Sequence, residues 1–508
     1  MANRKISRVL ISVFYKDNLQ PIIEELARHN VEFISTGGTQ SFIEQLGHKV
    51  TPVESLTGFP SIFDGRVKTL HPAIFGGILF RREDADHAAE ASKFGIGPID
   101  LVIVDLYPFE ETVARAGTEE EIIEKIDIGG ISLIRAAAKN YQDVLIVSSR
   151  EQYSDLLDLL QRKQCSSELG DRKSFAAWAF DVTAHYDSAI FDYFNRQEGL
   201  PVFRKEYRPG KQLRYGENPH QKGAYYGNLE ELFQQLNGKE LSYNNLVDID
   251  AAISLLKEFD GETAFVIIKH TNACGVATAG TTREAYQKAF QADTLSAFGG
   301  VLATNGKVDL EAAEEMNSLF FEILIAPGYD PEALKLLSAR KNRMILLQKK
   351  YPAAGKQFKS LLNGVIEQDH DLKTDTEDDL KVVTQKVPSA KEIKAMLFAS
   401  VICKHTKSNT IVLAVDGQLL ASGTGQTSRV DALKQAIEKA KGFGFDLKGA
   451  AMASDAFFPF PDCVELASEA GISAVIQPGG SVRDNESIAF CDQHDMAMVF
   501  TGTRHFKH

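Results

Sequence analysis

Cysteine is scarce in this chain of 508 residues, and no stretch approaches the length of a membrane-spanning segment. The five cysteines are an odd number, and no two are close enough to form a Cys-x-x-Cys ligand pair. Their spacing supports neither a disulfide framework nor a zinc site. The apolar stretch at residues 9–14 is too short for the core of a signal peptide. We therefore predict a reduced, cytoplasmic protein with no membrane partner and no metal.

Positive charge is also in deficit. Lysine and arginine total 56 against 69 aspartates and glutamates, which gives a formal net charge of −13. This charge argues against a protein that coats nucleic acid through its overall field, whereas local basic pockets for small phosphates remain compatible with it. The length predicts two or more domains, and 44% hydrophobic residues indicate a globular protein. We expect small anionic ligands and no nucleic acid.

The first two hundred residues alternate short apolar segments with helical patterns, which predicts a parallel α/β sheet. The predicted strands are residues 9–13, 31–34, 101–106 and 144–147. A helical pattern follows from Glu151 to about Arg196, and residues 197–209 are predicted to be a linker.

Three segments of this part have ligand-binding character. Residues 35–39, Ser-Thr-Gly-Gly-Thr, join a predicted strand to a helix, which predicts either a phosphate cradle or a tight turn without a ligand. Residues 64–72 crowd two cations, a hydroxyl and an imidazole into a loop. Asp127 precedes two glycines, and Lys139 closes the helix that follows. Taken singly, these two residues are more typical of helix caps than of catalysis.

A hexapeptide pattern, Val-Ile-x-Lys-His-Thr, occurs at residues 266–271 and 401–406. Each copy closes an apolar run that we interpret as a buried strand. Histidine exchanges protons near neutral pH and lysine supplies a cation, so the pair indicates proton-transfer chemistry. If the match is not chance, it predicts a duplicated unit.

Two further segments lie around this repeat. Residues 213–221 contain Gly, Pro, Arg, Tyr, Asn and His, which excludes regular helix or central strand and predicts a ligand wall or a polar surface loop. The acidic run at residues 371–379 is interpreted as a solvated connection between subdomains.

Several strings in this chain resemble a known family. In order along the chain they are GRVKTLHP (65–72), IDIGG (126–130), AAAKN (136–140), LRYGENPHQ (213–221), KELSYNN (239–245), SAFGG (296–300), SDAFFPF (454–460) and QPGGSVRD (477–484). They resemble the bifunctional purine-biosynthesis enzymes that join AICAR transformylase to IMP cyclohydrolase, where AICAR is 5-aminoimidazole-4-carboxamide ribonucleotide. The resemblance spans nearly the whole chain.

The resemblance implies an α/β fold in two parts. A methylglyoxal-synthase-like parallel-sheet domain with a helical extension would occupy residues 1–199. A duplicated, cytidine-deaminase-like transformylase domain would occupy residues 200–508, as two related subdomains at roughly 200–370 and 380–508. A homodimer with transformylase sites at the subunit interface is also implied.

The implied chemistry has two steps. The C-terminal part would transfer a formyl group from 10-formyltetrahydrofolate, a reduced folate co-substrate, to the amine of AICAR. The N-terminal part would close the product, formyl-AICAR, to IMP with loss of water. By motif, the implied catalytic residues are Lys269 and His270 for transfer, and Lys68, Tyr107, Asp127 and Lys139 for closure. The second hexapeptide, with His405, is assigned a supporting or ligand-binding role.

The resemblance also implies residues that bind substrate. In the N-terminal part they are Ser12, Lys16, Ser35, Thr36, Arg66 and Thr69, around the phosphate. In the C-terminal part they are Arg214, Tyr215, Asn409, Arg429, Asp455 and Arg504. Arginine suits phosphate because its planar donors bind oxygens in pairs.

The chain departs from the family pattern at several positions. Asp105 stands where asparagine is expected. The loop that begins at Ser12 reads Ser-Val-Phe-Tyr-Lys-Asp-Asn instead of Ser-Val-Ser-Asp-Lys-Thr-Gly, which puts Phe14 at a serine position. Ser400 replaces an expected tryptophan. Two alternatives to the family are a zinc-dependent deaminase, for which the Cys-x-x-Cys ligands are lacking, and a non-catalytic nucleotide sensor.

Overall fold

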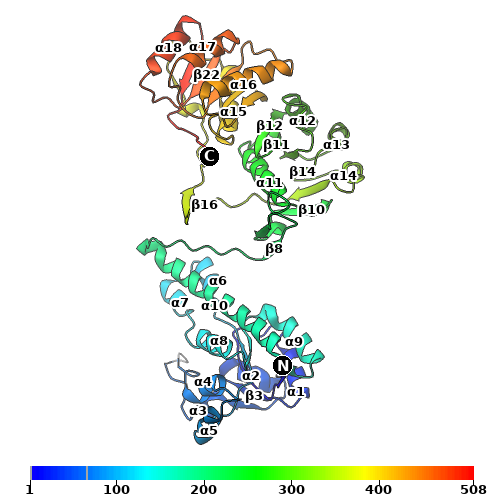
Figure 1. Cartoon of the computed structure of the whole chain (residues 1–508), viewed down its shortest axis with the longest axis vertical. Helices are drawn as coiled ribbons and strands as arrows, with labels where there is room; N and C mark the ends of the chain where they lie inside the picture. The colour runs from blue at the N-terminus through cyan, green and yellow to red at the C-terminus, as the bar shows by residue number, and fades with distance from the viewer. Residues whose placement is uncertain (1–2, 64–66) are drawn as a thin grey trace. The chain divides into compact units, whose positions relative to one another are not determined.

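The computed structural model describes residues 3–63 and 67–508. Its contacts divide the chain into two units, Met1–Glu206 and Tyr207–His508 (Figure 1). Among the described residues no helix has the length and apolar character needed to cross a membrane.

Unit 1 is built on a five-stranded sheet in the order β4-β3-β2-β5-β6, in which all neighbouring pairs are parallel. Its strands are β1 (Arg4–Lys5), β2 (Arg8–Ser12), β3 (Glu32–Ser35), β4 (Val50–Pro52), β5 (Leu101–Val104), β6 (Leu145–Val147) and β7 (Ser166–Ser167). Its helices are α1 (Gln20–Arg28), α2 (Gly37–Gln45), α3 (Val53–Thr57), α4 (Pro72–Leu79), α5 (Ala85–Lys93), α6 (Phe109–Ala114), α7 (Glu119–Ile123), α8 (Gly129–Lys139), α9 (Tyr153–Arg162) and α10 (Leu169–Glu198). The predicted parallel sheet is confirmed.

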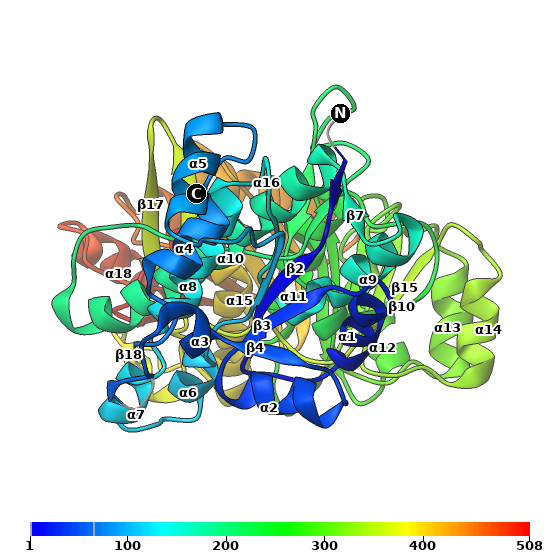
Figure 2. The ribbon, with the colours of Figure 1, turned by 90° about the horizontal axis from the view of Figure 1, so that it is seen from below.

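Successive residues of a strand face opposite sides of the sheet, and β2 illustrates this in unit 1. Val9 and Ile11 are fully buried in a core with residues of α1 and α9. Leu10 is buried on the other face, in a core with residues of α4, α8 and α10. Figure 2 shows β2, β3 and β4 side by side. Unit 1 therefore has three layers, with helices on both faces of the sheet.

Unit 2 is built on a twelve-stranded sheet in the order β10-β15-β14-β13-β11-β12-β20-β19-β21-β22-β23-β18. The strands of the unit are β8 (Gly210–Gln212), β9 (Ala224–Tyr226), β10 (Phe233–Asn237), β11 (Thr263–Lys269), β12 (Asn272–Ala279), β13 (Val301–Thr304), β14 (Ile323–Ala326), β15 (Met344–Gln348), β16 (Lys356–Leu361), β17 (Gly364–Asp369), β18 (Lys381–Val382), β19 (Ile411–Val415), β20 (Gln418–Gly423), β21 (Ala451–Ser454), β22 (Ala474–Gln477) and β23 (Ala497–Phe500). Its helices are α11 (Tyr243–Leu256), α12 (Thr282–Gln291), α13 (Leu310–Asn317), α14 (Pro331–Ser338), α15 (Ala390–Lys404), α16 (Arg429–Gly442), α17 (Asp462–Glu469) and α18 (Asp484–Gln493).

The two halves of unit 2 repeat one order of elements. The first runs α11-β11-β12-α12-β13-α13-β14-α14-β15, and the second runs α15-β19-β20-α16-β21-α17-β22-α18-β23. Strands β12 and β20 join the halves through an antiparallel pair at Ala277 and Gln418. Residues of α11 and α15 share one core on one face of the sheet. Helices α12–α14 and α16–α18 enclose two further cores, one in each half.

The two copies of the hexapeptide occupy different structures. The first ends β11, as predicted. The second lies at the end of α15, so its interpretation as a strand was wrong. Helix α15 begins at Ser389, whose side chain and that of Glu392 form a capping box, and its apolar run is buried helix. The duplication is in the order of elements, and the hexapeptide does not mark it.

Lys404 and His405 of the second copy bind Glu258, which follows α11. The Glu258 Oε1 accepts a hydrogen bond from Lys404 Nζ at 2.7 Å and lies 2.9 Å from His405 Nε2. Thr374 Oγ1 donates to the other carboxylate oxygen at 2.5 Å. Burial alone would raise the pKa of Glu258, but these hydrogen bonds lower it to about 2. This cluster ties the end of α11 to the end of α15.

We predicted that the acidic run at residues 371–379 is a solvated connection. The structure shows that part of this run is buried and bound to other residues. The carboxylate of Asp375 is buried and accepts a hydrogen bond from Ser400 Oγ at 2.7 Å. His505 lies between Asp371, at 2.7 Å from its Nδ1, and Asp375, at 3.5 Å from its Nε2. Burial lowers the pKa of His505, yet the two carboxylates outweigh it and raise this pKa overall. Ser400 thus supplies a polar partner at a position where we expected tryptophan.

Replacing Glu258 by glutamine should destabilise unit 2 by about 3 kcal/mol at pH 7, because Lys404 loses its counter-charge in a buried position. The lowered pKa means that the carboxylate contributes fully above the unfolded value of 4.5 and loses this contribution as pH falls toward about 2. The difference between wild type and variant should therefore shrink in that range. Urea unfolding at several pH values measures it.

The control for this experiment is Glu231→Gln, which removes an exposed, solvent-screened ion pair with Lys350 and should leave the free energy of unfolding nearly unchanged. The single tryptophan, Trp178, lies in α10 of unit 1, so its fluorescence follows unit 1 while circular dichroism follows both units. Equal effects of the two substitutions would contradict a structural role for Glu258.

Candidate functional sites

In unit 1 the predicted substrate-binding residues gather at the carboxyl edge of the parallel sheet. Ser12 ends β2, Ser35 ends β3, and Asp105 follows β5. Ser35 is fully buried and donates from Oγ to the carbonyl oxygen of Ile11 at 2.7 Å. Thr36 precedes α2 and donates to Glu54 at 3.1 Å. Ligands of open α/β sheets bind at this edge.

Asp105 organises the loop between β2 and α1. Its carboxylate accepts hydrogen bonds from the backbone N–H of Phe14 and, at 3.0 Å, of Tyr15. Lys16 Nζ donates to the carbonyl oxygens of Val13 and Phe14 in the same loop. Burial raises the pKa of Asp105. The departure from asparagine therefore has a structural counterpart, because the carboxylate accepts both amides.

Positive charge converges on the start of α2. Burial lowers the pKa of Lys16, and the nearby charge of Lys68 acts in the same direction. A Cβ atom on Gly37, the first residue of α2, would lie 3.8 Å from Lys68 Nζ. Two lysines and the N–H groups of a helix start are groups that suit an anion such as phosphate.

Asp127 lies beside this cluster, at the start of α8. Its Oδ1 accepts the backbone N–H of Gly130 at 2.6 Å, so it caps the helix as well. A Cβ atom on Gly130 would lie 2.5 Å from Asp127 Oδ2, which only glycine avoids. Burial raises the pKa of Asp127, while the charge of Lys68 lowers it. Burial and the charge of Asp127 also raise the pKa of Tyr107.

Two more of the predicted residues concern this site. Thr69 Oγ1 would lie 3.3 Å from a Cβ atom on Gly129, so Thr69 borders the start of α8. Arg66 lies outside the described residues. The structure therefore brings together Lys16, Lys68, Thr69, Tyr107 and Asp127.

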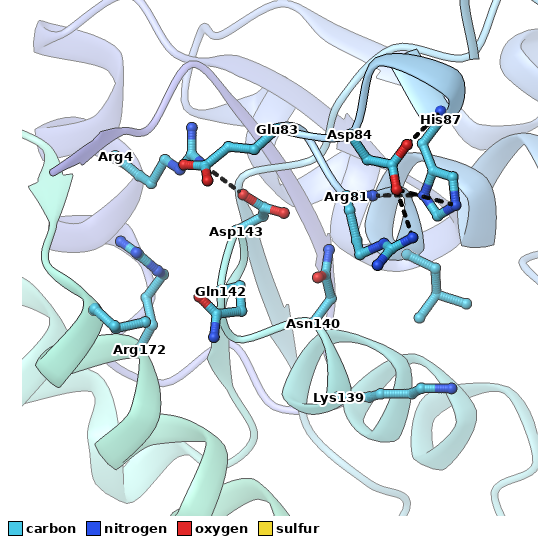
Figure 3. Close-up of a pocket in the computed structure, with 12 residues that line it drawn as sticks. Arg4, Arg81, Glu83, Asp84, His87, Lys139, Asn140, Gln142, Asp143 and Arg172 are labelled. Atoms are coloured by element: carbon cyan, nitrogen blue, oxygen red, sulfur yellow. Dashed lines mark hydrogen bonds and ion pairs between the residues drawn. The ribbon is translucent and has the colours of Figure 1, made fainter. Parts of the chain in front are cut away.

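Lys139 is not part of this group. It ends α8, and at 1.5 Å per residue the helix separates it from Gly129 by about 15 Å. There it lines a separate cavity of about 710 Å³ with Arg4, Asp143 and Arg172 (Figure 3). Asp143 comes before β6, at the amino end of the strand. A catalytic role for Lys139 stays a prediction.

In unit 2, Lys269 and His270 stand at a tight turn between β11 and β12. His270 and Thr271 both have positive φ, 50° and 64°, a conformation that costs energy outside glycine and asparagine. Asp248 of α11 accepts the Thr271 N–H at 2.7 Å. Thr271 Oγ1 and Asn272 Nδ2 donate to the His270 carbonyl oxygen at 2.6 and 2.8 Å. Three hydrogen bonds thus hold the turn that carries His270.

Lys269 is fixed by the SAFGG segment. Its Nζ donates to the carbonyl oxygen of Phe298 at 2.8 Å. Gly299 follows with φ of 70°, and a Cβ atom there would lie 3.1 Å from the same Nζ. Glycine therefore permits the lysine to approach the backbone.

Helix α11 also holds the loop that contains Arg214 and Tyr215. Asn244 Nδ2 donates to the Glu217 carbonyl oxygen at 3.2 Å. Asp248, which holds the turn, is four residues further along the same helix face. The guanidinium of Arg214 lies 5.5 Å from the ring centre of Tyr215. The irregular loop predicted at residues 213–221 is confirmed, and α11 contacts both this loop and the turn.

Asn409, Arg429, Asp455 and Arg504 form a group in the second half. Arg429 binds Asp455 Oδ1 at 2.9 Å, and Asn409 Nδ2 donates to the Gln426 carbonyl oxygen at 3.0 Å. The guanidinium groups of Arg429 and Arg504 lie 6.0 and 4.3 Å from the ring centre of Phe506.

Strand register places this group and the Lys269–His270 turn on the same edge of the sheet. Ile411, which starts β19, pairs with Gly423 at the end of β20 and with Ser454 at the end of β21. β12 is antiparallel to β20, so its first residue, Asn272, lies at the edge where β20 ends. The sequence motifs did not single out Asp248, whose role depends on a contact between α11 and the turn.

Within the described part of the chain no three His, Cys, Asp or Glu side chains come together as metal ligands would.

Comparison with known proteins identifies the family. A model described as AICARFT/IMPCHase bienzyme matches residues 137–439, and one described as MGS-like domain matches residues 18–132. The bifunctional purine biosynthesis protein PurH of Bacteroides thetaiotaomicron is 59% identical over 506 residues, covering 100% of this chain and 99% of that protein. The chain belongs to the AICARFT/IMPCHase bienzyme family. PurH proteins of Chlorobium phaeobacteroides (strain BS1) and Aquifex aeolicus are each 47% identical and cover 100% and 99% of this chain and all of their own length.

Membership of the AICARFT/IMPCHase family confirms the resemblance predicted from the motifs and the MGS-like N-terminal fold. The chain is a bifunctional enzyme of purine biosynthesis. The zinc deaminase and the non-catalytic sensor receive no support from these matches. The deaminase-like character of the repeated halves stays a prediction.

Asp248→Ala should lower the rate of formyl transfer by about 10- to 100-fold, because the turn that carries His270 loses one of its supports. Asp248→Asn should retain most of the activity, since its side-chain oxygen still accepts the Thr271 N–H. The rate of formyl-AICAR formation measures both variants, with cyclisation of added formyl-AICAR as the internal control. Full activity of the alanine variant would contradict this role.

Proposed function

We propose that unit 2 transfers a formyl group from 10-formyltetrahydrofolate to AICAR, and that unit 1 closes the product to IMP. The observation that carries this assignment is the turn of Lys269 and His270, held by Asp248 and by the Phe298 carbonyl oxygen. Formyl-AICAR and tetrahydrofolate leave the first step, and IMP and water leave the second.

The first step needs help because the amine of AICAR is conjugated with its ring and carboxamide and is a weak nucleophile. His270 accepts a proton as the amine attacks the formyl carbon. Lys269 stabilises the oxygen that gains negative charge or helps to protonate the folate nitrogen that leaves. The nucleotide and the folate are contacted by Arg214, Tyr215, Asn409, Arg429, Asp455 and Arg504. Of these, Asp455 faces the folate.

In the second step the carboxamide nitrogen attacks the formyl carbon, and the formyl oxygen leaves as water. Holding the substrate folded back accounts for much of the rate. Asp127, whose pKa is raised by burial, is suited to accept and return a proton. Lys68 and Tyr107 stabilise the oxygen that gains charge. The phosphate and the neighbouring part of the ribonucleotide are held by Ser12, Lys16, Ser35, Thr36, Arg66 and Thr69.

We also propose that the enzyme works in the cytoplasm as a homodimer, with the transformylase sites at the subunit interface. The support for both is the family. Sedimentation of the active protein tests the dimer, and a fully active monomer would refute it.

The central experiment supplies AICAR and 10-formyltetrahydrofolate and follows formyl-AICAR and IMP separately. His270→Ala should lower formyl transfer by about 100-fold or more and leave cyclisation of added formyl-AICAR unchanged. A variant that keeps full transfer would refute the role of His270.

Asp127→Asn should give the reverse pattern. Its amide keeps the shape and can still accept the Gly130 N–H, but it cannot take or give a proton, so cyclisation should fall by about 100-fold. Formyl-AICAR should then accumulate while formyl transfer continues. Wild-type cyclisation in this variant would exclude Asp127 from proton transfer.

A further inference from the structure

The loop between β2 and α1 exposes an aromatic side chain beside Tyr107 of the unit 1 site. Phe14 is 43% exposed, and Tyr107 is 36% exposed. Their rings meet edge to face, with centres 5.8 Å apart. Lys125 Nζ lies 5.7 Å from the centre of the Phe14 ring and 5.8 Å from that of Tyr107. Phe14 thus extends the surface of a residue already proposed to act in ring closure.

The aromatic wall, by which we mean Phe14 and Tyr107, is built into the fold. Asp105 binds the backbone N–H groups of Phe14 and Tyr15, and Lys16 binds the Phe14 carbonyl oxygen at 2.9 Å. Tyr15, next along the loop, donates from its hydroxyl to Glu111 at 2.8 Å and lies under the guanidinium of Arg150. The backbone on both sides of Phe14 is therefore fixed without a ligand.

The position of this wall decides what it can contact. Lys16 and Lys68 converge on the start of α2, where the phosphate would bind, and Asp127 lies on the Tyr107 side. If the phosphate of a ribonucleotide binds at α2 and its reacting groups lie at Asp127, the flat heterocycle that carries these groups lies on the Tyr107 side. An exposed phenyl ring there offers an apolar surface on which a second ring can pack.

We propose that Phe14 packs against the heterocyclic ring of the cyclohydrolase substrate and determines its affinity, and that Asp105 is the positioning residue that holds Phe14 there. This rests on the function proposed for unit 1. Phe14 and Asp105 stand at two positions where we expected serine and asparagine from the sequence.

The test compares Phe14→Ser with Phe14→Tyr, which keeps the ring and serves as the matched control. With formyl-AICAR supplied directly, Phe14→Ser should raise KM about fivefold to tenfold and change kcat less than about twofold. Phe14→Tyr should leave both within about twofold. An unchanged KM in Phe14→Ser, or a fall in kcat alone, would overturn the proposal.

Two inhibitors distinguish an effect on binding of the heterocyclic ring from an effect on binding of the phosphate. Phe14→Ser should weaken inhibition of cyclisation by IMP about fivefold to tenfold and leave inhibition by ribose 5-phosphate, which has no heterocycle, unchanged. Equal weakening of both would mean that the loop acts on the phosphate and would refute ring packing. Should Phe14→Ser disturb the Trp178 fluorescence of unit 1, Phe14→Leu takes its place, and a KM equal to that of Phe14→Tyr would again refute it.

Asp105 is tested by a double-mutant cycle. Asp105→Asn leaves one of the two loop amides without its acceptor and should raise KM about as much as Phe14→Ser. In the double variant KM should rise no further than in either single variant, because Asp105 acts through Phe14. Independent, multiplying effects would refute the positioning role. Wild-type protein that fails to cyclise formyl-AICAR would instead refute the function proposed for unit 1.

Discussion

The antiparallel pairing of β12 with β20 is the constraint on which unit 2 depends. It joins two halves with the same order of elements into one sheet, and equivalent strand ends therefore lie at opposite edges. The turn after β11, with Lys269 and His270, consequently shares its edge with the start of β19 and the end of β21. The turn equivalent to it, Asp416-Gly417 after β19, lies at the other edge. A repeated fold thus yields one edge on which different residues of the two halves meet.

The two copies of Lys-His differ in burial and in the charges around them. The first copy sits in a turn whose backbone is held in an unusual conformation, with Lys269 bound to a carbonyl oxygen. The second copy is almost fully buried and neutralised by Glu258. The same two side chains therefore stand at a held turn in one place, where we propose that they react, and link two helices in another. What decides between these roles is the surrounding structure and not the pair itself.

Much of unit 1 could be predicted from sequence, because its buried parallel strands are short apolar runs, such as residues 101–104, bounded by polar turns. The second hexapeptide failed because an apolar run buried on all sides looks the same in a helix and in a strand. Asp248 and Asp375 were missed or misread because their partners, Thr271 and Ser400, are distant in sequence. Local pattern predicts elements and candidate side chains, whereas contacts across the fold decide what each side chain does.

The order in which the chain is made gives the tail of unit 2 another significance. Unit 1 is a compact unit that ends at Glu206, so it can fold while the remainder is still being synthesised. Unit 2 cannot finish in this way. His505 binds Asp371, Lys507 donates to the His405 carbonyl oxygen, and the His505 N–H reaches Asp455. Until these residues, which are made after every strand of the sheet, emerge from the ribosome, the buried carboxylate of Asp375 lacks its histidine.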